Sequence, residues 1–440
     1  MTTAIKENLD VYLQSFRELE RRGKVPEWLA RIRTEAIERF LDLGFPTPRD
    51  EEWKYTNVAS IARTPFEPAP AVPAERAAER IATHALAQLD CPRLVFVNGK
   101  PVPELSSLGG LEAGVKVMSL EKAVASGTEP VEQYLARTAD PATHPFVALN
   151  TAFLQDGAWV EIPKRTALSK PIYLLYVTLP GSKPTVTYPR NVVLIGRESQ
   201  ATLIEGYLSL GDSAYLTNAV TEIIVEENSV LEYVKLQSES PAAFHVATVK
   251  MQQARNASAH ATTVTLGARL AREETASVLD GEGGEATLNG LYVLTGEQHV
   301  DNHTTLDHAK AHCSSRELYK GILEGRSTGV FNGKIIVRPD AQKTDSKQSN
   351  KNLLLSEDAT INTKPQLEIY ADDVKCTHGA TVGQIDAEAL FYLRSRGISQ
   401  REARNLLTVA FANDVLDKIK YAYLRERLKA SVLERLATQP

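Results

Sequence analysis

Hydrophobic residues recur at helical spacing in the first part of the chain, which predicts two helices there. One helix is predicted around Leu9. A second is predicted from Pro26 to Gly44, because proline suits a first helical turn and glycine suits the position after a last turn. Four prolines at positions 65 to 73 then indicate an extended linker. We therefore assign residues 1–90 to an N-terminal helical domain with a proline-rich linker.

The pattern changes from about residue 165 to residue 375, where short runs rich in β-branched and aromatic residues alternate with polar corners. The corner 226–229 and the run 230–236 are one example. Such strands could form a sandwich, a propeller or a solenoid, and no blade signature or strict repeat period is present. Many short strands with brief corners favour a β-solenoid, in which each turn stacks on the previous one. We assign residues 91–375 to a β-rich core.

Helical spacing returns at the end of the chain. Asp386, and Ser399 together with Glu402, are typical of helix starts. The helix predicted after Ser399 places apolar side chains on one stripe, which must face the chain's own core or a partner. The residues of this stripe are Ala403, Leu406, Leu407, Ala410 and Phe411. We assign residues 376–440 to a C-terminal helical domain.

Composition narrows the class of protein. The 440 residues carry a net charge of −5 without a basic domain, so nucleic acid is not an expected partner. No apolar run is long enough to span a bilayer, and the first residues lack the apolar core of a signal peptide. The cysteines, Cys91, Cys313 and Cys376, are far apart, which favours a reducing compartment. These features predict a cytoplasmic protein without a membrane partner.

The segment 299–313 is the densest group of potential metal ligands, with four of the nine histidines and Cys313. Imidazole and thiolate are good ligands for zinc and iron, so a metalloenzyme is one hypothesis. The spacing matches no standard zinc motif, however. A polar strand face whose imidazoles bond to neighbouring turns is the favoured interpretation.

Cys376 and His378 form a second candidate, flanked by acidic residues and glycines. A cysteine and a histidine two residues apart supply at most half of a metal site, which a second chain would have to complete. On spacing alone, a structural turn with a packed cysteine is the favoured interpretation. No phosphate loop, dinucleotide loop or nucleophile with a neighbouring base is present, so we expect no catalytic activity.

Several segments resemble the SufB/SufD family of iron–sulfur cluster assembly proteins, and the resemblance covers almost the whole chain. The segments that carry it are 308–321, 341–345, 352–356, 365–383 and 391–397. The segment 49–56, which contains Trp53, is similar to the SufD branch in particular. So is the sequence around His378, because SufB members carry Glu-His-Glu around the matching histidine.

The resemblance implies a right-handed parallel β-helix core flanked by N-terminal and C-terminal α-helical domains. It implies a non-catalytic scaffold that pairs with SufB through the β-helix cores. It also implies a C-terminal domain that docks a SufC ATPase, so the stripe from Ala403 to Phe411 is predicted to serve that contact. The histidine matching His378 lies at the SufB interface in this family. His378 is therefore predicted to donate one ligand to a nascent, transient iron–sulfur cluster shared with the partner chain.

Two alternatives to this scaffold function remain. A metalloenzyme using the segment 299–313 would hold tightly bound metal in the isolated chain, whereas a shared site predicts no tightly bound cofactor there. A SufB-type primary scaffold would accept sulfur on a reactive thiolate, which the scarcity of cysteines opposes. The Trp53 segment and the pair His378-Gly379 also oppose it. Self-dimerisation, and flavin binding in the complex, stay open.

Overall fold

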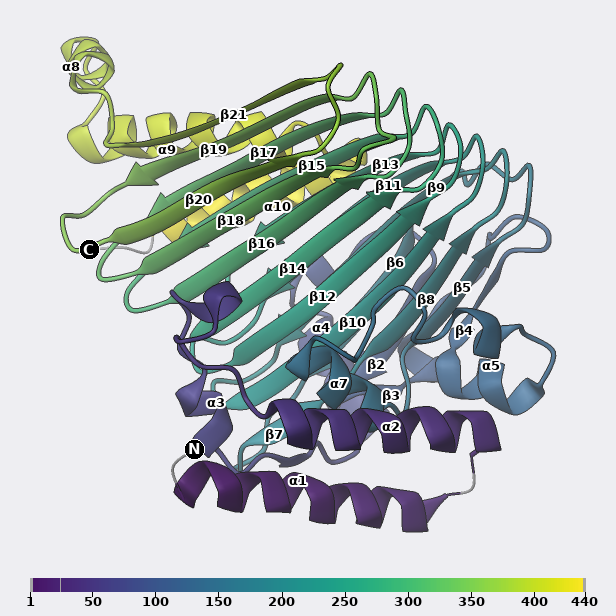
Figure 1. Cartoon of the computed structure of the whole chain (residues 1–440). Helices are drawn as coiled ribbons and strands as arrows, with labels where there is room; N and C mark the ends of the chain where they lie inside the picture. Colours follow the sequence, from purple (N-terminus) through teal and green to yellow (C-terminus); the bar gives the residue numbers. More distant parts are fainter. Residues whose placement is uncertain (1–2, 24, 438–440) are drawn as a thin grey trace.

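The computed structural model describes residues 3–23 and 25–437, and two long sheets stacked face to face form its centre (Figure 1). From residue 190 onward successive strands alternate between the sheets, so the chain winds as a β-solenoid of about eight turns. Strands make up 38% of the structure and helices 26%, with helices before and after the solenoid. The predicted fold class, a mainly β protein with a parallel β-helix core between helical regions, is confirmed.

Each sheet has its own spatial order of strands. The first sheet runs β20 (Thr360–Ile369), β18 (Thr328–Val337), β16 (His299–His308), β14 (Leu270–Leu279), β12 (Phe244–Gln253), β10 (Tyr215–Val225), β8 (Arg190–Ile195), β5 (Ala158–Ile162) and β4 (Lys116–Ser119), with β7 (Thr185–Thr187) and β1 (Glu67–Pro68) beside β10. The second sheet runs β21 (Lys375–Gly383), β19 (Asp345–Leu354), β17 (Ser314–Leu323), β15 (Glu285–Leu294), β13 (Ser258–Thr265), β11 (Val230–Ser238), β9 (Gln200–Ser209), β6 (Ile172–Thr178), β2 (Arg93–Val97) and β3 (Lys100–Pro101).

Strands of successive turns pair in parallel, residue against residue, so side chains stack in columns along the solenoid. Neighbouring residues of a strand point to opposite faces, and alternate columns therefore line the interior. Successive corners are separated by unequal numbers of residues, which explains why the sequence has no strict repeat period. Residues with positive φ at these corners include Arg165, Glu198, Asn228, Asn256, Ala268, Gly283, Gly296, His312, Gly325 and Lys343.

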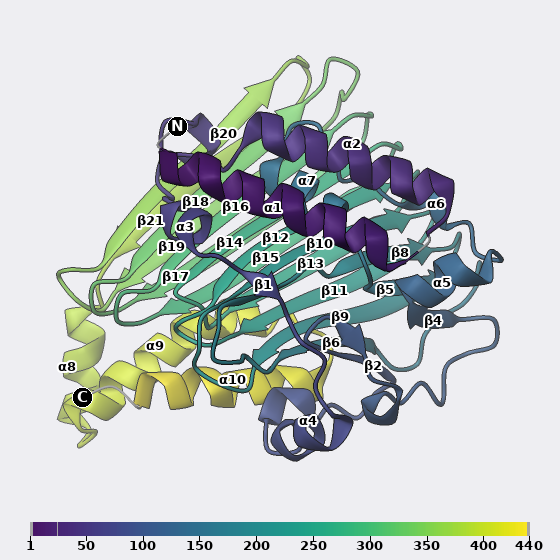
Figure 2. The same cartoon turned by 90° about the horizontal axis from the view of Figure 1, so that it is seen from below.

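Helices pack on part of the outer face of each sheet (Figure 2). Phe40, Phe146 and Phe244 belong to the buried cluster between the N-terminal helices and the first sheet. Val264 and Val415 belong to the cluster between the C-terminal helices and the second sheet. The helices are α1 (Thr3–Arg22), α2 (Glu27–Leu43), η1 (Glu51–Trp53), α3 (Ala59–Arg63), α4 (Ala74–Ile81), η2 (Ala85–Ala87), η3 (Pro103–Leu105), α5 (Leu120–Ser126), α6 (Val131–Tyr134), α7 (Pro145–Ala152), α8 (Ala387–Ser395), α9 (Gln400–Leu416) and α10 (Ala422–Ala437).

The C-terminal helices begin where the sequence predicts. The Asp386 side chain accepts hydrogen bonds from two backbone N–H groups of α8, and the Ser399 hydroxyl accepts one from Glu402 in α9. The solenoid, however, extends past residue 375, where the sequence pattern begins the helical domain, because β21 continues to Gly383. The small and polar side chains of this exposed strand hide its β pattern from the sequence.

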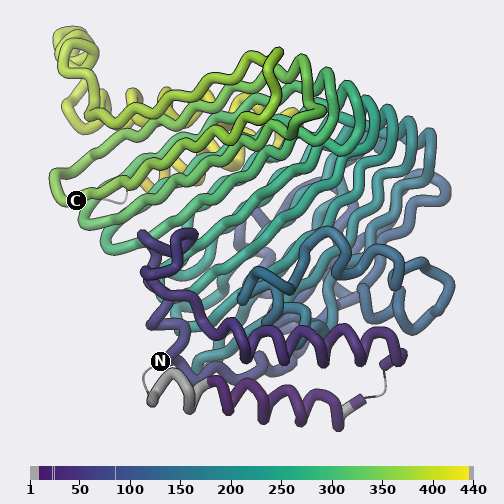
Figure 3. Tube along the Cα trace, viewed as in Figure 1, coloured from purple at the N-terminus to yellow at the C-terminus, as the bar shows by residue number. Residues whose placement is uncertain are grey.

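The last turn of the solenoid is open. The strands β20 and β21 lie at the ends of their sheets, so each has a neighbour strand on one side only. In the Cα trace no further turn stacks on them (Figure 3). Ile369, Tyr370 and Val382 are 40%, 63% and 49% exposed at this end. Among the described residues, this end therefore offers unpaired backbone groups beside apolar side chains.

Candidate functional site

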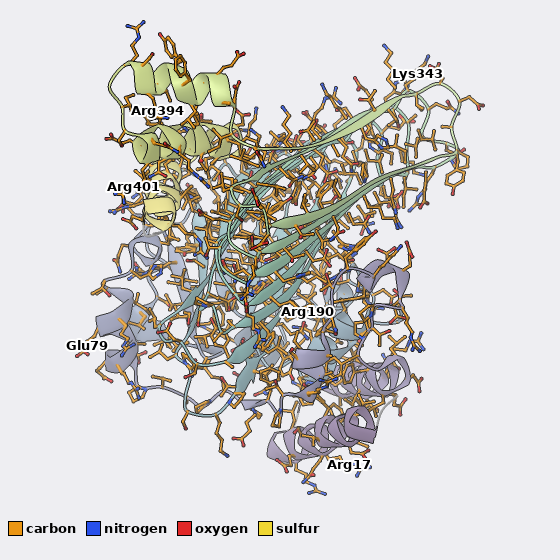
Figure 4. The ribbon with its side chains drawn as sticks, turned by 90° about the vertical axis from the view of Figure 1, so that its left-hand side faces the viewer. Arg17, Glu79, Arg190, Lys343, Arg394 and Arg401 are labelled. Atoms are coloured by element: carbon orange, nitrogen blue, oxygen red, sulfur yellow. The ribbon has the colours of Figure 1, made fainter. Side chains whose placement is uncertain are left out.

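His378 lies in β21, the edge strand of the second sheet, and its side chain is exposed. In the parallel ladder it is the partner of Gln348, which is in turn the partner of Glu317. The three residues share one column of the interior face. Figure 4 views this edge with side chains drawn, with Lys343 and Arg394 at opposite ends of it. His378 thus ends an interior column at the open end of the solenoid.

The two deeper residues of this column are buried, and they are hydrogen-bonded to each other. Gln348 is 1% and Glu317 3% exposed, and the Gln348 Nε2 donates to Glu317 Oε2 over 2.7 Å. Burial raises the pKa of Glu317 to about 7. The sequence alone did not indicate either residue. A polar residue in a predicted strand is expected at the surface unless the register of the strands is known.

Cys376 ends the neighbouring interior column. It is the partner of Ser346, whose hydroxyl lies 2.7 Å from that of Ser315, and Ser315 is 2.9 Å from His308 Nε2. Burial raises the pKa of the Cys376 thiol and lowers that of His308 to about 4. The column therefore holds a neutral thiol and a neutral imidazole at pH 7, and neither is prepared for nucleophilic attack.

The histidines of the segment 299–313 point in different directions. His299 and His303 face outward, His308 faces the interior, and His312 lies exposed at a corner. Across the part of the chain that the structure describes, no group of three or more histidine, cysteine and acidic side chains is arranged to hold a metal ion. The sequence cluster is thus not brought together as one site.

The outward pair instead contacts the N-terminal segment 49–56. The Thr56 hydroxyl lies 2.9 Å from His299 Nε2 and donates to Asp301 over 2.5 Å. Asp301 also lies 3.0 Å from His303, whose other ring nitrogen is 3.4 Å from Glu52. These contacts hold the segment on the first sheet. His299 and His303 therefore have structural contacts, which agrees with the interpretation favoured from the sequence.

Trp53 secures the same segment. Its ring is buried, and the Arg272 guanidinium stacks on it 3.8 Å from the ring centre. Arg272 also forms a buried ion pair with Asp301 over 2.5 Å. The aromatic segment noted in the sequence is therefore a fixed part of the solenoid surface near its open end.

The middle of the interior holds an ionic cluster that the sequence pattern does not indicate. His245 Nδ1 lies 2.6 Å from Glu239, and its Nε2 lies 3.3 Å from Glu273. Lys235 forms an ion pair with the other oxygen of Glu273. All four side chains are 5% exposed or less. Within this cluster the opposite charges compensate one another.

The predicted stripe of α9 is divided between two faces. Ala403 is buried and Phe411 is partly buried against the outer cluster of the second sheet, whereas Leu406 and Ala410 are exposed and Leu407 is intermediate. The division arises because α9 packs through a neighbouring row. That row comprises Ala403, Thr408, Ala412, Val415 and Leu416.

The helix α8 also carries exposed apolar side chains. Phe391 and Tyr392 are 72% and 57% exposed, and Leu406 is 52% exposed. The two aromatic residues lie outside the predicted stripe, although both belong to the helix that Asp386 caps. Three large apolar side chains are thus uncovered on adjoining helices.

Comparison with known proteins identifies the chain by family. Residues 3–174 match the model of the SufBD protein N-terminal region, and residues 177–411 match that of the SUF system FeS cluster assembly SufBD core domain. No helix among the described residues has the length and apolarity needed to cross a membrane.

Relatives from several bacteria match along most of their length. An iron–sulfur cluster assembly SufBD family protein of Synechocystis sp. is 35% identical, over 96% of this chain and 95% of its own. The iron–sulfur cluster assembly protein SufD of Escherichia coli is 33% identical over 91% of both chains, and that of Bacillus subtilis is 26% identical over 99% of both. The chain therefore belongs to the SufBD family of iron–sulfur cluster assembly proteins.

Proposed function

We propose that the chain is the SufD-type scaffold subunit of a cytoplasmic iron–sulfur cluster assembly complex, and that it contributes His378 to a cluster-forming site shared with SufB. The observation that carries this proposal is the position of His378, at the end of an interior column and in an uncovered edge strand. A single imidazole binds iron weakly alone. A partner that covers the last turn would supply the remaining ligands.

The open end suits a partner with the same architecture. Unpaired N–H and C=O groups of an edge strand are a template for further β pairing. Ile369, Tyr370 and Val382 add apolar surface at this end. A SufB-type solenoid that docks on β20 and β21 would extend both sheets and bring its own last turn beside His378.

The C-terminal helices suit the second proposed partner, a SufC-type ATPase. Phe391, Tyr392 and Leu406 are large apolar side chains that α8 and α9 leave uncovered. Clustered exposed residues of this kind mark interaction surfaces more often than isolated ones do. The docking surface would therefore combine the exposed part of the predicted stripe with the two aromatic residues of α8.

A scaffold function that depends on sulfur acceptance by this chain is less well supported. Burial raises the pKa of the thiols of Cys91, Cys313 and Cys376. A thiol that stays protonated is a poor sulfur acceptor. We therefore assign sulfur acceptance to the partner, and to this chain a non-catalytic role without tightly bound cofactor.

The test is co-expression with SufB and SufC, comparing wild type with His378→Ala. His312→Ala is the matched control, because His312 is also exposed but lies at a corner. We expect all three complexes to assemble, and only His378→Ala to carry little iron and sulfide after reconstitution. Unchanged iron and sulfide in His378→Ala would contradict the proposal.

A further inference from the structure

Gln348 is the residue directly behind His378 in the same interior column. The two are partners in the parallel ladder between β19 and β21, so their side chains leave the same face of the sheet. Neighbouring strands of a sheet are about 4.8 Å apart, which is within reach of a glutamine side chain. The Gln348 amide is therefore a buried polar group within reach of the His378 imidazole.

The Gln348 amide is held from two sides. Its Nε2 donates to Glu317 Oε2 over 2.7 Å. Across the interior, a Cβ on Gly333 would lie only 2.3 Å from the same Nε2, so β18 accepts the amide because position 333 has no side chain. Because Nε2 is held in this way, Oε1 is the amide atom that is available to accept a hydrogen bond.

That oxygen has no partner. The Gln348 Oε1 is buried, and it accepts no hydrogen bond from any described residue. A buried acceptor without a donor has lost its hydrogen bonds to water without replacement, which destabilises a protein. Asn350, two residues along the same strand, differs: its Nδ2 donates to the Tyr319 carbonyl over 3.2 Å, and its Oδ1 accepts from Asn352 over 2.6 Å.

We infer that Gln348 is a positioning residue for His378: its Oε1 accepts the ring N–H of His378 when a partner covers the last turn, which directs the other ring nitrogen toward the shared site. This inference rests on the proposed function. A histidine that binds a metal usually donates its second ring N–H to an oxygen of the protein, which fixes the tautomer and the ring orientation. The structure holds such an oxygen in place, buried and unused.

The test uses the reconstituted, reduced complex with SufB and SufC. Pulsed EPR measures the nitrogen hyperfine coupling of a histidine bound to the cluster, and iron retention after gel filtration measures affinity. The test variant is Gln348→Met, which has similar volume but no acceptor. Asn350→Leu places an apolar side chain in the neighbouring column as a control.

We expect His378→Ala to remove the nitrogen coupling. In Gln348→Met the coupling should shift or broaden, and iron affinity should fall by about tenfold or more. Asn350→Leu should leave both readouts at the wild-type value. If Gln348→Met fails to assemble, Gln348→Asn replaces it, because the shorter amide withdraws the oxygen, and the same changes are expected.

Different results would contradict the ligand role of His378 and the positioning role of Gln348. If His378→Ala loses the coupling while the Gln348 variants keep the wild-type coupling and iron content, His378 is a ligand but Gln348 does not position it. If His378→Ala itself keeps the coupling and the iron, the proposed function is wrong and the inference about Gln348 is wrong with it.

Discussion

Buried charged side chains are paired in the middle of the solenoid, but not all buried polar groups are paired near its last turn. In the middle, Lys235, Glu239, His245 and Glu273 pair their charges with one another. Toward the last turn, Gln348 and His378 belong to a column in which the buried Gln348 Oε1 accepts no hydrogen bond from a described residue and the outermost imidazole is exposed. One scaffold thus contains a complete ionic cluster and an incomplete polar column. We infer from the difference that the middle serves stability, and it agrees with the proposal that a partner covers the last turn.

The electrostatics follow the same division. Burial alone would lower the pKa of His245, but the carboxylates of Glu239 and Glu273 together outweigh it, so the pKa is raised and the charged form of the ring is favoured. Near the open end the opposite occurs. No basic side chain among the described residues pairs with Glu317, so burial raises its pKa to about 7 and it titrates near neutral pH.

Removing one charge from the middle should have the largest effect on stability. Lys235→Met leaves Glu273 without its ammonium partner, and an uncompensated buried charge destabilises by about 3 to 5 kcal/mol. Guanidinium unfolding of the isolated chain measures the loss. Adding Glu273→Gln should recover most of it. If Lys235→Met alone unfolds like the wild type, the cluster does not stabilise the middle of the solenoid.

Glu317 should give a smaller, pH-dependent effect. Its folded pKa of about 7 lies above the ordinary value of 4.5, so the folded state binds the proton more tightly. Stability is therefore lost as pH rises from about 4.5 through 7, by up to about 3 kcal/mol. Glu317→Gln cannot titrate, so its stability advantage over wild type should grow between pH 5 and pH 8. A pH-independent difference between the two unfolding curves would contradict this.

Substitution at the open end should affect association more than folding. Val382→Asp places a charge on the apolar part of β21, and we expect binding to SufB to weaken tenfold or more, which is about 1.4 kcal/mol. The unfolding free energy of the isolated chain should change by less than about 0.5 kcal/mol, because the side chain is already exposed. Titration calorimetry measures the affinity, and Leu433→Asp, at an exposed site on α10, is the control. If both variants bind SufB with equal affinity, SufB does not bind at the open end of the solenoid.

His378→Ala should have the smallest effect on the isolated chain. The imidazole is exposed, and no hydrogen bond or ion pair links it to another described residue. The unfolding free energy should therefore stay within about 0.5 kcal/mol of wild type. A loss above about 2 kcal/mol would mean that His378 already supports the fold, as the residues in the middle do.

Much of the fold follows from the sequence, because helix caps and short β-rich runs are local signals. Asp386 and Ser399 are examples. The interior columns could not be predicted in this way. Which residues stack depends on corners of unequal length, so Lys235 and Gln348 read as surface positions in the sequence. His378 was identified through family resemblance and not through its spacing from Cys376. The division of the α9 stripe could not be predicted either, because it depends on how that helix packs against the second sheet.

The most direct test of the account is iron retention by the isolated chain and by its complex with SufB. Both are incubated anaerobically with ferrous iron and sulfide, desalted, and assayed for bound metal. We expect the isolated chain to retain almost none and the complex to retain a cluster, because the last turn supplies only part of a shared site. Stoichiometric iron in the isolated chain would contradict the account, and it would direct attention back to the histidines of the segment 299–313.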